Sequence, residues 1–287
     1  MFSDAVRDST NPALHLRAPS VVPEIRSRPT SNARTPVADR GRNIAPKRPV
    51  SAELVLRTFN TWAFKREQPT EPQLLLKIIA DAIALNAPVP FVMYWGKGPR
   101  AALGGPDVRC LDYLASLVAR VRDVYKPGVA ITLIFTDTHA TLNGHTPESM
   151  RSYFRDVEAE AQTRGFEGCL LSRLITGIDP ADCVEEMPEA MRHSLFECAK
   201  KWFRGEGTAE EGAQQYYQMN MVEKRAVERA FPNAVFVTFN GSEYRSLFPR
   251  SLPVFYMYSL RRGFGVKPWF LPDDAVEPAP APAQAAP

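Results

Sequence analysis

The sequence has few cysteines, and none of them forms a pair that would hold a metal. Four cysteines are scattered along 287 residues without a C-x-x-C spacing, which argues against a zinc ribbon or a thioredoxin-like site. No apolar run reaches the ~18 residues of a membrane span, and residues 1–30 lack the uninterrupted apolar segment of a signal peptide. We therefore expect a cytoplasmic protein, with no membrane partner, whose thiols are reduced.

Nucleotide-binding signatures are absent as well. Neither G-x-x-x-x-G-K-[ST] nor G-x-G-x-x-G follows an apolar run, so the sequence gives no support for ATP, NAD or another cofactor. His139 and His145 lie near each other in the sequence, but no third ligand accompanies them, so no metal is expected. The net charge of +3 is too small an excess to make the whole chain a nucleic-acid binder.

The two ends of the chain differ from its middle in residue composition and in the absence of a helical or strand period. Residues 1–50 combine prolines and arginines without a helical or strand period, and residues 272–287 alternate proline with alanine. We predict a disordered basic arm at 1–50, one folded domain at 51–271 and a disordered tail at 272–287. The arm is either a solvated linker or a segment that binds RNA or a protein partner.

The folded region alternates helical periodicity with short apolar runs. A strand, a helix and a second strand joined by a crossover of about twenty residues form the unit that produces a parallel sheet. We expect an α/β domain of three layers with a mostly parallel sheet. Helices are predicted from Ser51, from Thr70 to Asn86, at 106–125, 146–164, 188–204 and 208–231, and strands at 91–95, 129–135, 168–175, 234–239 and 254–259.

In open α/β sheets ligands bind beyond the carboxyl ends of the strands. The first segment there is Gly96-Lys97-Gly98-Pro99-Arg100. Its glycines leave backbone amides accessible beside Lys97, a combination that suits a carboxylate or phosphate, and we take Lys97 and Arg100 as substrate-binding candidates. The alternative is a tight turn with a solvent-facing lysine.

The second segment is one short loop after the strand at 129–135. It carries Asp137, His139, Asn143 and His145, groups that can orient and deprotonate a polar substrate. We take Asp137 and His139 as catalytic candidates and Asn143 as a substrate-binding one. Asp137 could instead hydrogen-bond the amides of its own loop, and His145 could lie exposed before the next helix.

Two further places contribute candidates. Arg261 and Arg262 follow the last strand and could make bidentate contacts to an anionic substrate. In the helix at 208–231, the spacing puts Tyr216, Asn220 and Glu223 on one face, where a buried carboxylate could bind an amino group. From this helix we take Glu223 as catalytic and Tyr217 as substrate-binding; an ordinary amphipathic helix with a salt-bridged glutamate is the alternative.

The stretch from Lys97 to Tyr153 resembles the pyoverdine/dityrosine biosynthesis family, the isocyanide (isonitrile) synthases. The resemblance lies in Lys97 with Pro106-Asp107, in the segment 121–128 that ends Tyr125-Lys126-Pro127-Gly128, and in Thr136-Asp137-Thr138, where the family has Ser-Asp-Gly. A weaker similarity is Lys267-Pro268-Trp269-Phe270. The chain departs from the family at Thr138, at Phe270 and at Asn143-Gly144-His145, which replaces an acidic segment.

The resemblance implies a Rossmann-like enzyme of specialised metabolism. It would convert the α-amino group of an amino acid to an isocyanide, with a pentulose phosphate as the carbon donor. Lys97 and either Arg261 or Arg262 would hold the anionic groups of the substrates, and Asp137 would act as acid and base. One alternative is a tRNA-dependent enzyme similar to the cyclodipeptide synthases, which form peptide bonds from aminoacyl-tRNA; the basic arm and the helix at 216–223 favour it. The other is a non-catalytic binding protein of the same fold.

Overall fold

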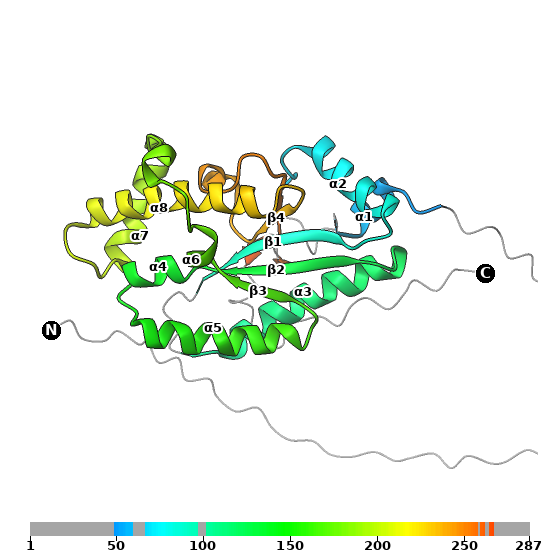
Figure 1. Ribbon diagram of the computed structural model, residues 1–287, viewed down its shortest axis with the longest axis horizontal. Helices are drawn as coiled ribbons and strands as arrows, with labels where there is room; N and C mark the ends of the chain where they lie inside the picture. The colour runs from blue at the N-terminus through cyan, green and yellow to red at the C-terminus, as the bar shows by residue number, and fades with distance from the viewer. Residues whose placement is uncertain (1–48, 60–66, 97–101, 258, 262–263, 267–287) are drawn as a thin grey trace, which may run out of the picture. The chain divides into compact units, whose positions relative to one another are not determined.

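Five parallel strands form the central sheet in the order β3-β2-β1-β4-β5 (Figure 1). The computed structural model describes residues 49–59, 67–96, 102–257, 259–261 and 264–266. The strands are β1 (Val89–Trp95), β2 (Val129–Phe135), β3 (Glu167–Leu170), β4 (Val235–Thr238) and β5 (Val254–Tyr256). All four strand pairs are parallel, so the α/β class and the parallel sheet expected from the apolar runs are confirmed.

Helices connect the strands, and several start at the residue types that the sequence offers as caps. Thr146 and Thr208 accept hydrogen bonds at 3.2 Å from the amides of Ser149 and Glu211, which satisfies backbone donors that a helix start leaves free. The helices are α1 (Ala52–Phe59), α2 (Pro72–Ala84), α3 (Gly105–Val124), α4 (Asp137–Leu142), α5 (Pro147–Gln162), α6 (Leu171–Leu174), α7 (Glu189–Trp202) and α8 (Ala209–Ala230), with 3-10 turns η1 (Pro180–Cys183) and η2 (Ser242–Leu247). An antiparallel pair, β6 (Ser259–Arg261) and β7 (Phe264–Val266), follows.

The sheet separates two hydrophobic cores. Along β1, Phe91, Met93 and Trp95 pack into the core shared with α3 and α5, whereas Val92 and Tyr94 face the core shared with α8. This alternation follows from the two-residue period of a strand that is covered on both faces. Figure 1 shows α3 and α5 on one side of the sheet and α8 on the other. The domain therefore has the three layers of a Rossmann-like fold, as expected.

Three local predictions are wrong. The segment after β2 is not a loop, because Asp137–Leu142 forms α4. The strand predicted at 168–175 ends at Leu170, which pairs with Phe135, the last residue of β2; beyond it no partner strand continues, and the chain turns into α6. Thr70 does not cap α2, because its hydroxyl accepts a hydrogen bond from the amide of Val254 at 2.8 Å.

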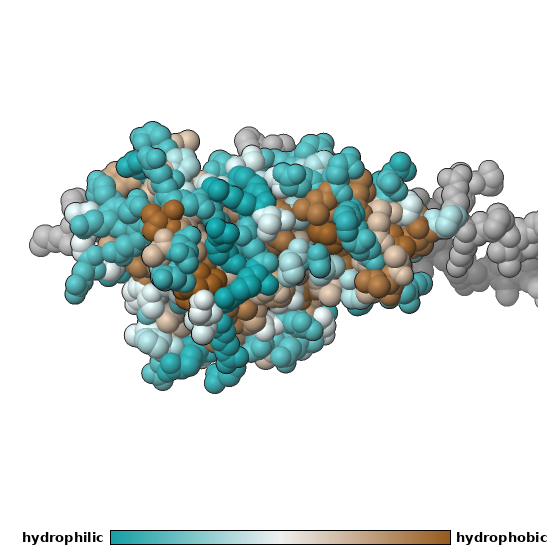
Figure 2. All heavy atoms as spheres, turned by 45° about the horizontal axis from the view of Figure 1, so that its top comes forward, coloured by the Kyte–Doolittle hydropathy of each residue, from teal (hydrophilic) through white to brown (hydrophobic). Residues whose placement is uncertain are grey.

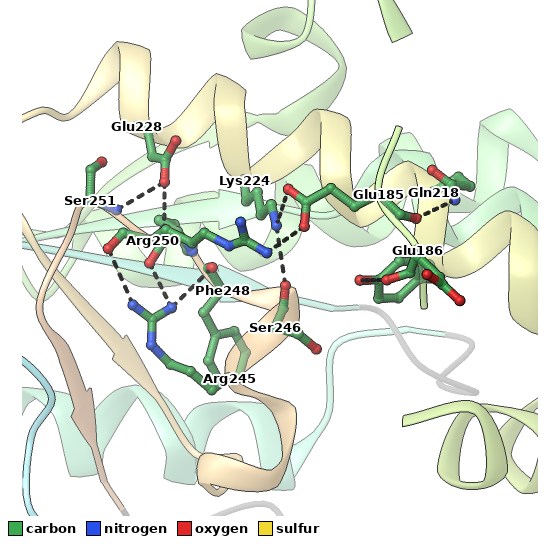
Figure 3. A network of polar contacts seen from close by, with 12 residues as sticks. Glu185, Glu186, Gln218, Lys224, Glu228, Arg245, Ser246, Phe248, Arg250 and Ser251 are labelled. Atoms are coloured by element: carbon green, nitrogen blue, oxygen red, sulfur yellow. Dashed lines mark hydrogen bonds and ion pairs between the residues drawn. The ribbon is translucent and has the colours of Figure 1, made fainter. Parts of the chain in front are cut away.

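A network of charges holds two segments against α8 (Figure 3). Lys224 is 2% exposed, and its Nζ lies 2.8 Å from Oε1 of Glu185, whose other oxygen lies 2.5 Å from Arg250. Glu228 accepts hydrogen bonds from the amides of Arg250 and Ser251. The network therefore ties the segment that leads into α7 and the segment that leads into β5 to the same helix.

Several predictions concern residues outside the described ranges. They are residues 1–48 of the arm predicted at 1–50, the tail at 272–287, the resemblance at 267–270, and Lys97, Arg100 and Arg262. Within the described part of the chain, no helix is both long enough and apolar enough to cross a bilayer. On the face shown in Figure 2, hydrophilic residues predominate and apolar ones form separate patches.

Candidate functional site

A cavity of about 700 Å³ opens at the carboxyl ends of the central strands. Gly96 follows β1, Thr136 follows β2 and Thr238 ends β4, and all three line it. In the strand order, β1 has β2 on one side and β4 on the other: the chain runs from β1 outward to β2 and β3, and then crosses back to β4 and β5 on the other side of β1. Such a switch point leaves a crevice that helices do not fill, which explains the position of the cavity.

The walls of the cavity come from α4, α7, α8 and η2. Aromatic rings supply much of the lining, among them Tyr94, Phe203, Tyr216 and Phe248. Polar groups come from the ends of the strands, at Thr136 and Thr238, from α4 and the residues after it, and from Asn220 of α8. A mostly apolar cavity with a few convergent polar groups is the arrangement of a small-molecule site, where the polar groups fix the orientation of the ligand.

The short helix α4 places His139 against Glu223 of α8. Nε2 of His139 lies 2.5 Å from Oε2 of Glu223, and Thr138 donates a hydrogen bond to Oε1 of the same carboxylate at 2.6 Å. The side chain of Glu223 is 2% exposed and that of His139 is 12% exposed. His139 lines the cavity and Glu223 lies behind it, so the pair can act on a ligand only through the imidazole.

Two tyrosines stand beside this pair. The ring of Tyr216 lies 4.8 Å from the ring of His139, and burial together with the charge of Glu223 raises the pKa of Tyr216. Burial raises the pKa of Tyr94 well above its ordinary value, with Glu223 and Tyr216 adding to the effect. Both phenols are therefore neutral at physiological pH and are available as hydrogen-bonding groups.

The other residues singled out from the sequence lie in different places. Asn143 lines the cavity with His139. Asp137 does not; its Oδ1 accepts a hydrogen bond from the amide of Ser172 at 3.0 Å, which ties the start of α4 to α6. Tyr217 is turned away from the described lining, and its hydroxyl donates to the carbonyl of Glu186 at 3.1 Å. Glu223 and His139, the two remaining catalytic candidates, are in contact.

The predicted cationic residues are mostly outside the described ranges. Lys97, Arg100 and Arg262 lie outside them, and Arg261 is described only as the last residue of β6. Among the described residues that line the cavity, Arg204 is the only lysine or arginine. Its guanidinium donates to the carbonyls of Phe203 and Lys201 at 2.7 and 2.9 Å, so it is held at the end of α7.

The segment Asn143-Gly144-His145 joins α4 to the end of α7. Gly144 has φ +76, and a Cβ there would lie 2.9 Å from the Cβ of Arg204. The amide of Arg204 donates to the carbonyl of Leu142 at 2.9 Å. Glycine is therefore required where the two elements approach, and Asn143 and His145 on either side of it both line the cavity.

A buried chain of hydrogen bonds fixes the end of β1 beside the site. Trp95 donates from Nε1 to the hydroxyl of Tyr153 at 3.2 Å, and Tyr153 donates to Oδ1 of Asp107 at 2.9 Å. The other oxygen of Asp107 accepts from the amide of Gly104 at 3.1 Å. Asp107 of the Pro-Asp pair thus links the end of β1, through Tyr153, to the start of α3.

Sequence reasoning missed several groups of the site. Tyr94 lies within an apolar run and gives no separate signal. Tyr216 was recognised by its spacing to Asn220 and Glu223, but Tyr217 was chosen as the binding residue. The spacing was informative, because Tyr216 and Asn220 line the cavity and Tyr217 lies on another side of α8. In the described residues no cluster of three or more histidine, cysteine or acidic side chains could hold a metal.

Comparisons with known proteins give similarity in structure alone. No protein-family model and no curated protein matches the sequence. The crystal structure of the PvcA protein from Pseudomonas aeruginosa is similar, with a TM-score of 0.56 and 17% identity over 76% of this chain and 87% of PvcA. Tyrosyl-tRNA synthetase from Archaeoglobus fulgidus, complexed with L-tyrosine, has a TM-score of 0.47 and 14% identity over 72% of this chain and 64% of the synthetase. The match to PvcA confirms at the level of the fold the resemblance drawn from the sequence motifs.

Proposed function

We propose that the protein is an isocyanide-synthase-like enzyme of specialised metabolism that binds a free amino acid in this cavity and acts on its α-amino group. The observation that carries the proposal is the contact between His139 and Glu223 at the wall of a cavity at the switch point of the sheet. The fold of PvcA, which belongs to the isonitrile synthase family, supports the same reading.

His139 has the geometry of a general base. A carboxylate can only accept a hydrogen bond, so the contact with Glu223 places the imidazole hydrogen on Nε2. In the neutral ring, Nδ1 then carries a lone pair, and within the described structure Nδ1 makes no hydrogen bond. In this role Glu223 holds the tautomer and stabilises the imidazolium that forms when Nδ1 takes a proton.

Such a base suits an amino group. An amino acid carries its α-amino group as ammonium near neutral pH, and the nitrogen must lose a proton before it can attack a carbonyl carbon. His139 is the group proposed to take that proton, and the hydroxyl of Tyr216 beside its ring is a second polar contact. The cavity volume of about 700 Å³ falls within the range of sites for small organic ligands and leaves room for a sugar phosphate as well.

The carboxylate of the amino acid and the phosphate of the co-substrate are anionic, so the site needs cationic side chains to bind them. Lys97 directly follows Gly96, which lines the cavity, and Arg100 comes three residues later; Arg204 lines the cavity just after α7. We assign the carboxylate of the amino acid and the phosphate of the co-substrate to Lys97, Arg100, Arg261 and Arg262. Asp137, first expected as an acid and base, has instead the contact of a residue that positions α4.

Mass spectrometry of a defined reaction tests the proposal. The purified protein is incubated with each of the common amino acids and ribulose 5-phosphate, and His139→Asn serves as the matched inactive variant. The expected product has gained one carbon and lost two hydrogens relative to the amino acid, and it is missing with His139→Asn. Recovery of every amino acid unchanged by the wild-type protein would contradict the proposal.

One observation favours the tRNA-dependent alternative. Tyr216 lines the cavity beside the ring of His139, and Glu223 contacts that ring from behind; the cyclodipeptide synthases are similar in using a tyrosine and a glutamate near the amino group. Charged tRNA would then be the substrate, and the basic arm its contact. Product formation from free amino acids that survives RNase treatment excludes this alternative, whereas formation of a dipeptide only with charged tRNA establishes it.

A further inference from the structure

Lys224 is a charged side chain inside the domain, only 2% exposed, and it follows Glu223 directly in α8. Its Nζ lies 2.8 Å from Oε1 of Glu185 and donates a hydrogen bond to the carbonyl of Ser246 at 3.4 Å. Figure 3 shows the ammonium between these two partners. Glu185 lies just before α7 and Ser246 lies in η2, so one ammonium joins α8 to two other segments of the chain.

The three joined elements form walls of the cavity. The described lining residues that they supply include Tyr216 and Asn220 of α8, Leu195 and Cys198 of α7, and Tyr244 and Leu247 of η2. Lys224 and Glu185 are not among the described lining residues. The ion pair therefore lies behind the walls, where it can set the distance between them without touching a ligand.

Stability alone does not account for an ion pair at this depth. Burial lowers the pKa of Lys224 although Glu185 opposes the effect, because desolvation disfavours the charged form. The attraction within a buried pair often only offsets that cost, and apolar side chains of similar volume frequently stabilise a fold equally well. Apolar side chains lack direction, whereas ion pairs and hydrogen bonds hold their partners at defined distances and angles.

The two segments that Lys224 contacts have few regular restraints of their own. Residues 184–188 form neither helix nor strand, and η2 is a 3-10 turn of six residues. Side-chain contacts therefore decide where such segments lie, because no long backbone ladder holds them. Arg250 contacts the second oxygen of Glu185, but its side chain is 65% exposed, and water weakens an exposed pair. The buried contact with Lys224 is the stronger restraint.

We propose that Lys224 is a positioning residue, which with Glu185 and the carbonyl of Ser246 holds η2 and the start of α7 at the separation that lets the cavity bind its substrate. The inference rests on the proposed function, since that substrate is the amino acid proposed to react in the same cavity. Lys224 acts on binding through the walls, whereas the proton transfer belongs to His139 and Glu223. Loss of the ion pair should therefore raise KM and leave kcat nearly unchanged.

A double variant separates positioning from stability. Glu185→Gln combined with Lys224→Met removes both charges together, so no uncompensated charge is left in the interior and the fold is kept. Arg229→Met is the matched control. Arg229 lies in the same helix and donates to the carbonyls of Leu174 and Thr176 at 2.7 and 2.9 Å, and neither of these two is among the described lining residues.

Hydrogen exchange followed by mass spectrometry is the first measurement, because it needs neither ligand nor turnover. In the double variant we expect amide exchange at 184–191 and 242–248 to accelerate about tenfold or more, the effect of losing a hydrogen bond to a charged group. Exchange along α8 should keep its wild-type rate, and so should both segments in Arg229→Met.

Turnover is the second measurement, made with ribulose 5-phosphate and the amino acid that the wild type consumes fastest. In the double variant, KM for the amino acid should rise about tenfold while kcat stays within about twofold of the wild-type value. Arg229→Met should change neither. A merely structural role of the ion pair would lower stability without separating KM from kcat in this way.

Urea unfolding establishes that each variant is folded. If the double variant is unfolded, Glu185→Asp takes its place: it keeps both charges on a shorter side chain, and the same two segments should then exchange faster. Unchanged exchange in both segments, faster exchange throughout the domain, or an unchanged KM would each overturn the inference. Local acceleration without any product from the wild type refutes only the proposed function, and product formation without local acceleration refutes only the inference.

Discussion

Nε2 of His139 and Oε2 of Glu223 are 2.5 Å apart although 84 residues separate them in the chain. The contact joins α4, which follows the second strand, to the middle of α8. It brings a titratable ring to the wall of the cavity with a buried carboxylate behind it. The proposed chemistry and the first two predictions depend on this pair.

Replacing the carboxylate of Glu223 by an amide should remove most of the activity. In Glu223→Gln the side-chain amide no longer holds the hydrogen on Nε2 of His139 as a carboxylate does, and the imidazolium loses its counter-charge. We expect kcat to fall about 10²- to 10⁴-fold, the range for loss of general acid–base catalysis. The rate of amino-acid consumption measures it.

Glu210→Gln provides the control for that variant. Glu210 lies exposed on the first turn of the same helix, so its substitution changes the same charge at a distance from the cavity. It should leave kcat within about twofold, since exposed charges have small effects. Equal losses in both variants would show that the charge of α8, and not the contact with His139, matters.

Thr138 should act through Glu223. Its hydroxyl donates to Oε1 at 2.6 Å, so Thr138→Val leaves one oxygen of a buried carboxylate without a partner. We expect kcat/KM to fall about tenfold, equivalent to one hydrogen bond to a charged group, and Thr138→Ser to restore it. The pH profile of kcat/KM should shift in Thr138→Val and recover in Thr138→Ser.

Thr141→Val controls for a hydroxyl lost from α4 itself. The hydroxyl of Thr141 donates to the carbonyl of Thr138 in an exposed position. Unchanged kcat/KM and an unchanged pH profile are expected for it. A shift of the same size as in Thr138→Val would mean that the helix, and not the orientation of Glu223, is disturbed.

Cysteine labelling should report occupation of the cavity. Cys198 of α7 is exposed and lines the cavity, whereas Cys110 and Cys183 are buried and burial raises the pKa of Cys169 to about 11. Iodoacetamide should modify Cys198 first, because the thiolate is the reactive form. A bound amino acid should slow that modification severalfold, as followed by peptide mass spectrometry. Labelling of Cys198 at one rate with every amino acid would argue that none occupies this cavity.

Breaking the buried ion pair of Figure 3 should destabilise the domain. Glu185→Gln leaves Lys224, which is 2% exposed, without its counter-charge. We expect a loss of about 2–3 kcal/mol in the free energy of unfolding, measured with urea, because an uncompensated buried charge is costly. Adding Lys224→Met should recover most of that loss. Asp81→Asn, which breaks the exposed pair with Lys77, should cost less than about 0.5 kcal/mol.

Stability should fall in alkali. Burial raises the pKa of Tyr94, Tyr113, Tyr216 and Tyr256 in the folded protein, whereas the unfolded chain titrates its tyrosines near pH 10. The contribution of these phenols is complete below that pH and is lost as pH rises towards their folded pKa values, because the unfolded state releases protons first. Urea unfolding from neutral pH upward checks this. Tyr256→Phe should make the alkaline decline shallower, and an identical decline in that variant would contradict the assignment.

The sequence predicted the architecture better than the site. The apolar runs at 91–95 and 129–135 and the long amphipathic helices are local patterns, and the structure contains them. The helix α4 was missed because its six residues, Asp137–Leu142, carry little apolar periodicity. The strand β3 is shorter than predicted because it ends where its partner β2 ends, and the sequence of β3 itself does not contain that information.

The site depended on contacts between distant segments, which no local pattern contains. Glu223 and His139 were each selected, but nothing in the sequence indicates that they touch. Tyr217 was chosen where Tyr216 lines the cavity because a shift of one residue turns a side chain by about 100° on a helix.

A crystal structure of the protein with a bound amino acid tests the central claim most directly. We expect the ligand in the cavity with its α-nitrogen within hydrogen-bond reach of Nδ1 of His139, about 2.6–3.2 Å, and with its carboxylate directed away from Glu223. An amino acid bound at another place, or one in the cavity with its nitrogen remote from His139, would contradict the account.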